Sequence, residues 1–157
     1  MKATPDEIEK YLKLLAETPR RIESLSRGMD NVQLQLKPDG DSWSTNDILA
    51  HLRSCADVWG KTIQEMLIKD NPILPYVHPR QWIKKTNYPE IDFHTSLQAF
   101  TDQRKELLMV LKKLNFKDWS RASIIKGREH TVFTQIRRMA THENEHCEQI
   151  KAMLKSK

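Results

Sequence analysis

The sequence predicts an all-α protein, a single four-helix bundle domain that spans residues 1–157. Three observations predict this fold class. Four long segments carry apolar residues at helical spacing, leucine heavily outnumbers valine, and no alternating apolar run is long enough to indicate a substantial strand. The length suits one hydrophobic core better than two. Amphipathic helices of this number and length typically pack as an antiparallel-type bundle.

The four helices are expected at about residues 4–25, 45–69, 93–114 and 132–154. The first has Thr4 as its N-cap and Pro5 at its first helical position, and its stripe ends before Gly28. The third begins behind Asp92. The expected core stripes of the first, third and fourth helices are Ile8, Leu12, Leu15 and Ile22; Phe93, Leu97, Phe100, Leu107, Leu108, Leu111 and Leu114; and Val132, Ile136, Met139, Ile150 and Met153.

The second helix has the best-marked start. Ser44 can cap it together with Asp47, three residues further along. Trp43 before the cap and Ile48 in the first turn are placed to pack together and fix the entry angle of the chain.

The connections differ in length. Residues 71–91 contain four prolines, at 72, 75, 79 and 89, and are expected to form a long crossover between the second and third helices. Its aromatic residues can form a functional wall or simply cover one side of the core. Residues 115–129 contain Trp119 and Gly127 and can form a turn or a brief hairpin.

Composition excludes several classes of function. The four glycines are too far apart for a G-x-G-x-x-G motif or a phosphate-binding loop. The longest apolar run, residues 107–111, is far too short to span a membrane. The 26 basic residues exceed the 21 acidic ones but are scattered, whereas nucleic-acid binding needs a cluster. We expect a cytoplasmic protein without membrane or nucleic-acid partners, in which Cys55 and Cys147 are free thiols.

Three of the six histidines, His51, His142 and His146, fall on apolar stripes and are expected to face the core. Residues four apart on a helix project only about 40° apart, so His142 and His146 can bind one metal from a single face. An inward histidine must satisfy two polar nitrogens in apolar surroundings, which is costly unless a ligand is shared. We therefore expect a divalent metal ion on these three residues.

The fourth helix also contains His142-Glu143-Asn144-Glu145-His146, a formal match to the H-E-x-x-H motif of zinc proteases. Those enzymes take a third ligand from further along the chain, and only 11 residues follow His146 here. We therefore do not expect a protease of that kind. Glu143 is the candidate catalytic residue, as a base or as a partner of a ligand, the alternative being a surface glutamate.

Several motifs together resemble the DinB/YfiT-like superfamily. The resemblance covers most of the chain from about residue 40 onward. Its three segments are Trp43-Ser44 with Asp47, Leu49 and His51; Phe116-Lys117-Asp118-Trp119 behind the third helix; and His142-x3-His146 followed by Gln149-Ile150. The resemblance implies a four-helix bundle with a long second crossover, a divalent metal on His51, His142 and His146, and a homodimer. It also implies hydrolysis, thiol transfer or thiol-dependent isomerisation as candidate reactions.

Three neutral histidines leave coordination positions open, which is typical of a catalytic site. A bound water or thiol would lose its proton near neutral pH. The first functional hypothesis is thus a metal-dependent enzyme that activates water or a low-molecular-weight thiol, for hydrolysis or thiol transfer on a small molecule. A basic surface favours an anionic thiol.

The second functional hypothesis is a non-catalytic, metal-stabilised bundle with a binding or stress-related regulatory role. Cys55 bears on this choice, because a fourth ligand from Cys55 would close the site. The alternative is that Cys55 is an ordinary core residue. We expect zinc or nickel, with iron and manganese as alternatives, since all of them accept imidazole. Exposed Tyr76 and Trp82 are expected to contribute to a homodimer interface.

Overall fold

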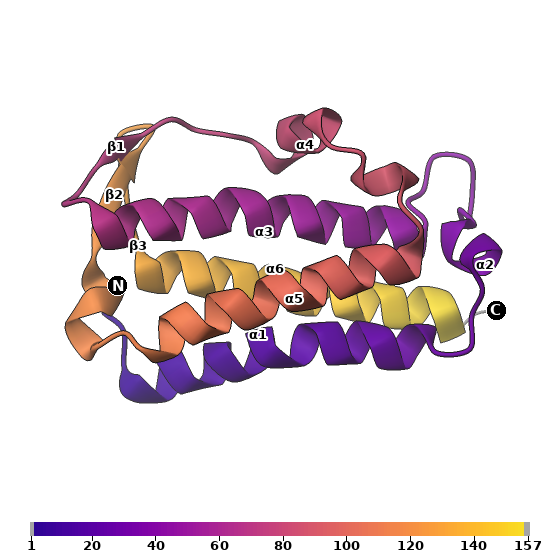
Figure 1. Ribbon diagram of the computed structural model, residues 1–157, viewed down its shortest axis with the longest axis horizontal. Coiled ribbons are helices and arrows are strands. Elements are labelled where there is room, and N and C mark those ends of the chain that lie inside the picture. Colours follow the sequence, from indigo (N-terminus) through magenta and orange to yellow (C-terminus); the bar gives the residue numbers. More distant parts are fainter. Residues whose placement is uncertain (1, 156–157) are drawn as a thin grey trace.

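The computed structural model describes residues 2–155 and shows the expected four-helix bundle (Figure 1). The long helices are α1 (Pro5–Ser26), α3 (Thr45–Ile68), α5 (Phe93–Lys112) and α6 (Val132–Lys155). Each packs against two others, so that α1 lies beside α5 and α6, and α3 also lies beside both. The crossover returns the chain to the end of the bundle where α3 began, so α5 runs parallel to α3. The bundle is therefore not antiparallel throughout.

Helix α3 begins as the sequence predicts. The Ser44 hydroxyl accepts a hydrogen bond from the Asp47 amide at 3.0 Å, and the Asp47 carboxylate accepts one from the Ser44 amide at 2.9 Å. These bonds satisfy backbone groups that a helix start leaves free. Trp43 packs against the cluster that contains Ile48. This reciprocal cap fixes the first turn, from which His51 projects one turn later.

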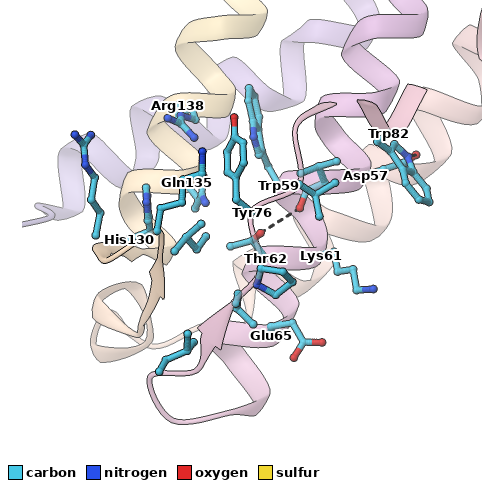
Figure 2. A pocket seen from close by; sticks show the side chains of 18 of the residues that line it. Asp57, Trp59, Lys61, Thr62, Glu65, Tyr76, Trp82, His130, Gln135 and Arg138 are labelled. Atoms are coloured by element: carbon cyan, nitrogen blue, oxygen red, sulfur yellow. Dashed lines mark hydrogen bonds between the residues drawn. The ribbon is translucent and has the colours of Figure 1, made fainter. Parts of the chain in front are cut away.

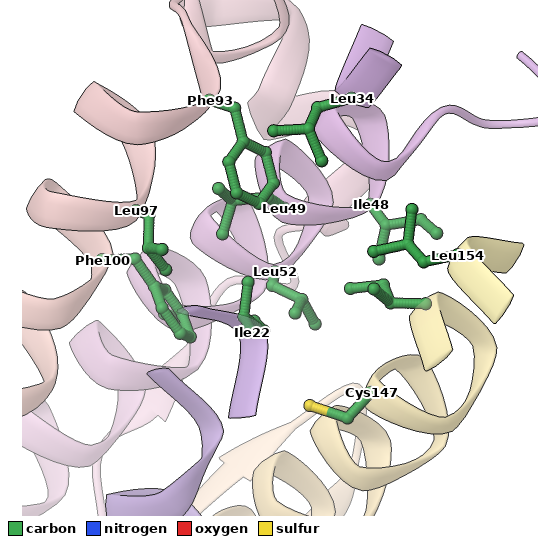
Figure 3. Close-up of a cluster of buried hydrophobic side chains, with 12 residues drawn as sticks. Ile22, Leu34, Ile48, Leu49, Leu52, Phe93, Leu97, Phe100, Cys147 and Leu154 are labelled. Atoms are coloured by element: carbon green, nitrogen blue, oxygen red, sulfur yellow. The ribbon is translucent and has the colours of Figure 1, made fainter. Parts of the chain in front are cut away.

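The core consists of two apolar clusters along the bundle axis. One, drawn in Figure 3, includes Phe93, Phe100 and Cys147, and the other includes Phe133 and Met139. Along α6 the second cluster ends at Ala140 and the first resumes at Cys147. The residues between them include two histidines and a buried glutamate. The polar residues thus occupy a layer between two apolar ones.

The connections contain short helical elements that the sequence did not predict. Helix α2 (Asn31–Gln35) is capped by Asp30, whose carboxylate accepts a hydrogen bond from the Gln33 amide at 2.8 Å. It buries Leu34 in the core. Three 3₁₀ turns, Ile83–Lys85, Tyr88–Glu90 and Phe116–Ser120, lie in the connections.

The expected hairpin is present and belongs to a small sheet. Strands β2 (Ala122–Ile125) and β3 (Arg128–Thr131) pair antiparallel, and β1 (Ile73–Leu74) adds to β2 in parallel. Lys126 and Gly127 connect the hairpin with φ angles of 53° and 72°, as a two-residue turn of this type requires. Strands of two and four residues are too short to give a period-two signal.

The crossover lies against α3 and forms a wall of the molecule. The Asp57 carboxylate accepts hydrogen bonds from Trp82 Nε1 at 2.9 Å, Tyr88 Oη at 2.6 Å and Gln103 Nε2 at 2.8 Å. Helix α4 (Pro79–Trp82) is held in place by these bonds. Trp82 is therefore engaged within its own chain, whereas Tyr76 is 47% exposed.

Candidate metal centre

The structure brings the three predicted histidines together between α3 and α6. His51 Nε2 lies 3.2 Å from His142 Nε2, which lies 3.1 Å from His146 Nε2. Ligand atoms of all three lie within 4.8 Å of one another. His51 comes from α3, and the other two lie one turn apart on α6. The i, i+4 spacing and the packing of α3 on α6 thus produce the cluster.

Three converging imidazole nitrogens fit a divalent cation. The His146 Nδ1 proton is donated to Gln149 Oε1 at 2.8 Å, so His146 Nε2 carries a lone pair that faces the cluster. Each neutral imidazole has one N–H group and one nitrogen with a lone pair. The three converging nitrogens therefore cannot all be paired by hydrogen bonds to one another, and some of their lone pairs face each other. Tetrahedral zinc at about 2.0–2.1 Å from each nitrogen would place ligand nitrogens about 3.3 Å apart. The two separations that involve His142 Nε2, 3.2 and 3.1 Å, are close to that value.

The surroundings keep the imidazoles of His51 and His142 neutral, as metal binding requires. Burial, together with the neighbouring histidines and Arg80, lowers the pKa of His51 to about 4. Burial, His146 and Arg138 likewise lower the pKa of His142 to about 4. His51 is only 8% exposed. At neutral pH both residues can therefore offer a lone pair.

Aromatic rings enclose the cluster. The Trp43 ring centroid lies 4.9 Å from that of His51 and 6.4 Å from that of His146. The Trp59 ring meets His142 nearly edge-on at 5.1 Å. Packing of this kind restricts ring rotation and excludes water from two sides of the site.

One side of the cluster is accessible. A cavity of about 460 Å³ is lined by His146, Gln149, Trp43 and Arg80, among others. Arg80 stacks over Trp43, with its guanidinium carbon 5.2 Å from the ring centroid. A small molecule entering here would meet a histidine ligand and a positive charge.

Glu143 does not join the histidine cluster. It is 1% exposed, so the surface alternative is wrong, and its oxygens accept hydrogen bonds from Arg104 at 2.7 and 2.5 Å. Arg104 also donates to the carbonyl of Leu15 at 2.8 Å. Both carboxylate oxygens of Glu143 are thus engaged by one buried guanidinium. The catalytic role of Glu143 stays a prediction, and its contacts favour a structural one.

Cys55 lies beside the cluster and is buried. Its Sγ is 3.6 Å from His51 Nε2, but it does not belong to the group of converging ligand atoms. Burial raises the pKa of its thiol to about 12. Its place outside the converging ligand atoms favours the core interpretation of Cys55.

The other three histidines lie elsewhere. His78 caps α4, where its Nδ1 accepts a hydrogen bond from the Arg80 amide at 3.0 Å. His94 is exposed near the start of α5, and His130 lies on β3. The sequence alone assigns no functional role to Trp59 or Arg104. For Arg104 a signal exists, because it is a charged residue on the apolar stripe of the third predicted helix.

Comparison with known proteins agrees with this architecture. The model of the DinB superfamily matches residues 14–150 of the chain. This four-helix bundle with a three-histidine cluster therefore belongs to the DinB superfamily.

Two relatives are informative. A protein of Halalkalibacterium halodurans named "Putative metal-dependent hydrolase BH0277" is 22% identical over 149 residues, covering 94% of this chain and 86% of its own. YfiT from Bacillus subtilis, described as a probable metal-dependent hydrolase with an unusual four-helix bundle topology, superposes with a TM-score of 0.84 at 15% identity. That match covers 98% of this chain and 88% of YfiT. It confirms the predicted fold.

No helix within residues 2–155 has the combined length and apolar character needed to cross a bilayer.

Proposed function

We propose that His51, His142 and His146 hold one divalent metal ion and that the protein is a metal-dependent hydrolase of a small molecule. The convergence of the three Nε2 atoms, at 3.1 and 3.2 Å, is the observation that carries this proposal. The names of the two relatives support the same reaction class. Zinc or nickel suits three neutral imidazoles best, with iron or manganese as alternatives.

A bound divalent cation would lower the pKa of a coordinated water or thiol towards neutrality and so supply a nucleophile. The chain's own residues do the remaining work. Gln149 fixes the tautomer of His146, and Trp43 and Trp59 restrict the rings and exclude bulk water. Arg80, on the wall of the accessible cavity, places a positive charge beside the cluster.

Thiol transfer is the second candidate reaction. The positive charge of Arg80 contributes to the low pKa of His51, so it acts at the cluster itself and favours an anionic co-substrate such as a thiolate. In that case the small-molecule partner would be an electrophile together with a low-molecular-weight thiol.

A substrate screen distinguishes the candidates. Zinc-loaded and nickel-loaded protein would be assayed with p-nitrophenyl esters, anilides and 1-chloro-2,4-dinitrobenzene, the last with and without cysteine. Turnover of esters or anilides that disappears in the His146→Ala variant supports the hydrolase. Turnover of the electrophile only with the thiol supports the transferase. No metal-dependent turnover of any of them would favour a non-catalytic, metal-stabilised bundle with a binding or regulatory role.

A further inference from the structure

A larger cavity lies beside the histidine cluster. Its volume is about 800 Å³, and its walls come from the second half of α3, the first part of the crossover, the β2–β3 hairpin and the start of α6. In Figure 2, Arg138, Gln135 and His130 lie on one side of it, with Tyr76 and Trp59 close by. None of the three clustered histidines lines it.

The charges of this cavity are unbalanced. The described residues that line it include five basic side chains, Lys61, Lys69, Lys126, Arg128 and Arg138, and two acidic ones, Asp57 and Glu65. Both acids are already engaged. Glu65 pairs with Lys69 at 2.7 Å, and Asp57 accepts three hydrogen bonds from neutral donors. The cavity therefore has a surplus of positive charge, which attracts anions.

Arg128 and Arg138 are the arginines that remain available. Within residues 2–155, neither forms an ion pair. Both act on His130, whose pKa is lowered by burial and then by the charges of Arg138 and Arg128. Both arginines line the same cavity as His130. An arginine can bind a carboxylate or phosphate with two parallel hydrogen bonds.

The wall also contains an unused polar atom and flat apolar surfaces. Gln135 is 2% exposed, and its Oε1 has no hydrogen-bond partner within the described chain. Buried polar atoms are rarely left unpaired, so an N–H or O–H of a ligand is a natural partner. Tyr76 and Trp59 present aromatic surfaces to the same space.

Trp59 and Arg138 connect this cavity with the histidines. The Arg138 guanidinium carbon lies 5.6 Å from the Trp59 ring centroid, and the Trp59 ring lies 5.1 Å from that of His142. Arg138 and His142 are four residues apart on α6, about 6 Å along the helix axis. A molecule anchored at Arg138 would therefore lie about one helical turn from His142, on the cavity side of the Trp59 ring.

We propose that this cavity binds an organic anion with a flat apolar body, its carboxylate or phosphate held by Arg138 and Arg128 and its body against Trp59. The assignment of this anion as the substrate rests on the proposed function, whereas binding itself does not. The substrate class is then an aromatic or similarly flat acid whose scissile group lies away from its charge.

Fluorescent probes test the binding. The aromatic sulfonate 8-anilinonaphthalene-1-sulfonate would be titrated into chelator-treated wild-type protein, and N-phenyl-1-naphthylamine, the same ring system without the charge, would serve as the matched probe. Because hydrogen bonds to charged groups are among the strong ones, Arg138→Met and Arg128→Met should each weaken sulfonate binding about tenfold. Binding of the neutral probe should change little.

Matched variants keep the result interpretable. Arg20→Met removes an exposed arginine on α1, outside the cavity wall, and should bind the sulfonate like wild type. Arg138→Lys keeps the charge and should recover part of the affinity, and thermal melting would establish that each variant is folded. Displacement of the probe by benzoate or by phenyl phosphate shows whether a carboxylate or a phosphate is preferred.

The outcomes separate the two proposals. Loss of sulfonate binding confined to the cavity arginines supports the anion site even where the histidines bind no metal. Unchanged binding in a folded Arg138→Met variant, equal losses for both probes, or an equal loss in Arg20→Met would overturn it.

Discussion

Gln149 Oε1 accepts a hydrogen bond from His146 Nδ1 at 2.8 Å, three residues along the same helix. Because the proton is held on Nδ1, His146 presents the lone pair of Nε2 to His51 and His142. Residues that orient a ligand in this way contribute to metal affinity without touching the metal.

Gln149→Leu should therefore weaken metal binding by about 10- to 100-fold while leaving the fold intact. Competition with a chromophoric chelator measures this affinity. Gln98→Leu is the matched control, because Gln98 donates to Asp102 on the exposed face of α5. Equal affinities for the two variants would show that Gln149 has no role at the site.

The Arg104–Glu143 pair should act on stability. Both side chains are nearly fully buried, at 3% and 2% exposed, and removing one partner leaves an uncompensated buried charge. Arg104→Met and Glu143→Gln should each lower the free energy of unfolding by about 3–5 kcal/mol, as measured by urea denaturation. The double variant Arg104→Met/Glu143→Met should be more stable than either single one.

The same variants test the catalytic prediction for Glu143. If Glu143 were a general base, Glu143→Gln would keep wild-type stability and metal content and reduce turnover by about two to four decades. The contacts of Glu143 with Arg104 predict instead that Glu143→Gln lowers the free energy of unfolding.

The metal-free protein should lose stability in mildly acidic solution. Burial first, and then neighbouring charges, lower the pKa of His51 and His142 to about 4, against 6.5 in the unfolded chain. Between these values the unfolded chain binds protons that the folded chain does not. The free energy of unfolding should therefore fall as the pH is lowered through this window.

Urea denaturation with a chelator at several pH values would check this dependence. The variant His51→Gln/His142→Gln should show a smaller decrease between pH 6.5 and 4. An identical pH profile for wild type and variant would contradict the prediction.

The homodimer remains a prediction, and the structure changes which residues are candidates for its interface. Trp82 is used within the chain, so the exposed residues Ile73, Tyr76 and Val77 are the remaining candidates on the crossover, at 85%, 47% and 41% exposed. Sedimentation at tens of micromolar should give a dimer, and Ile73→Lys should shift it towards monomer. A wild-type monomer at that concentration would count against the interface.

The parts of the fold that the sequence predicts are those with local signals. Ser44 and Asp47 mark a helix start, and His142 and His146 share a face because they are four apart on one helix. The capping residues Asp30 and Gln33 are a local signal of the same kind for the short helix α2.

The remaining features depend on residues distant in the chain. The pairing of Ile73 with Ile124 and of Arg104 with Glu143 follows no spacing rule. Arg104 on α5 and Glu143 on α6 meet across the interior of the bundle, because both helices pack against α1 and α3. The position of Glu143 next to a candidate ligand suggested a catalytic role and did not show that its side chain pairs with Arg104. The cavity around Arg138 likewise requires the hairpin, the crossover and two helices to be in place.

The most direct test of the metal centre is the metal content of purified protein, measured by inductively coupled plasma mass spectrometry for single histidine variants. We expect about one divalent ion per chain in wild type and in His78→Ala, His94→Ala and His130→Ala. Most of it should be lost in His51→Ala, His142→Ala and His146→Ala. Full metal occupancy in any of these last three folded variants would contradict the three-histidine site.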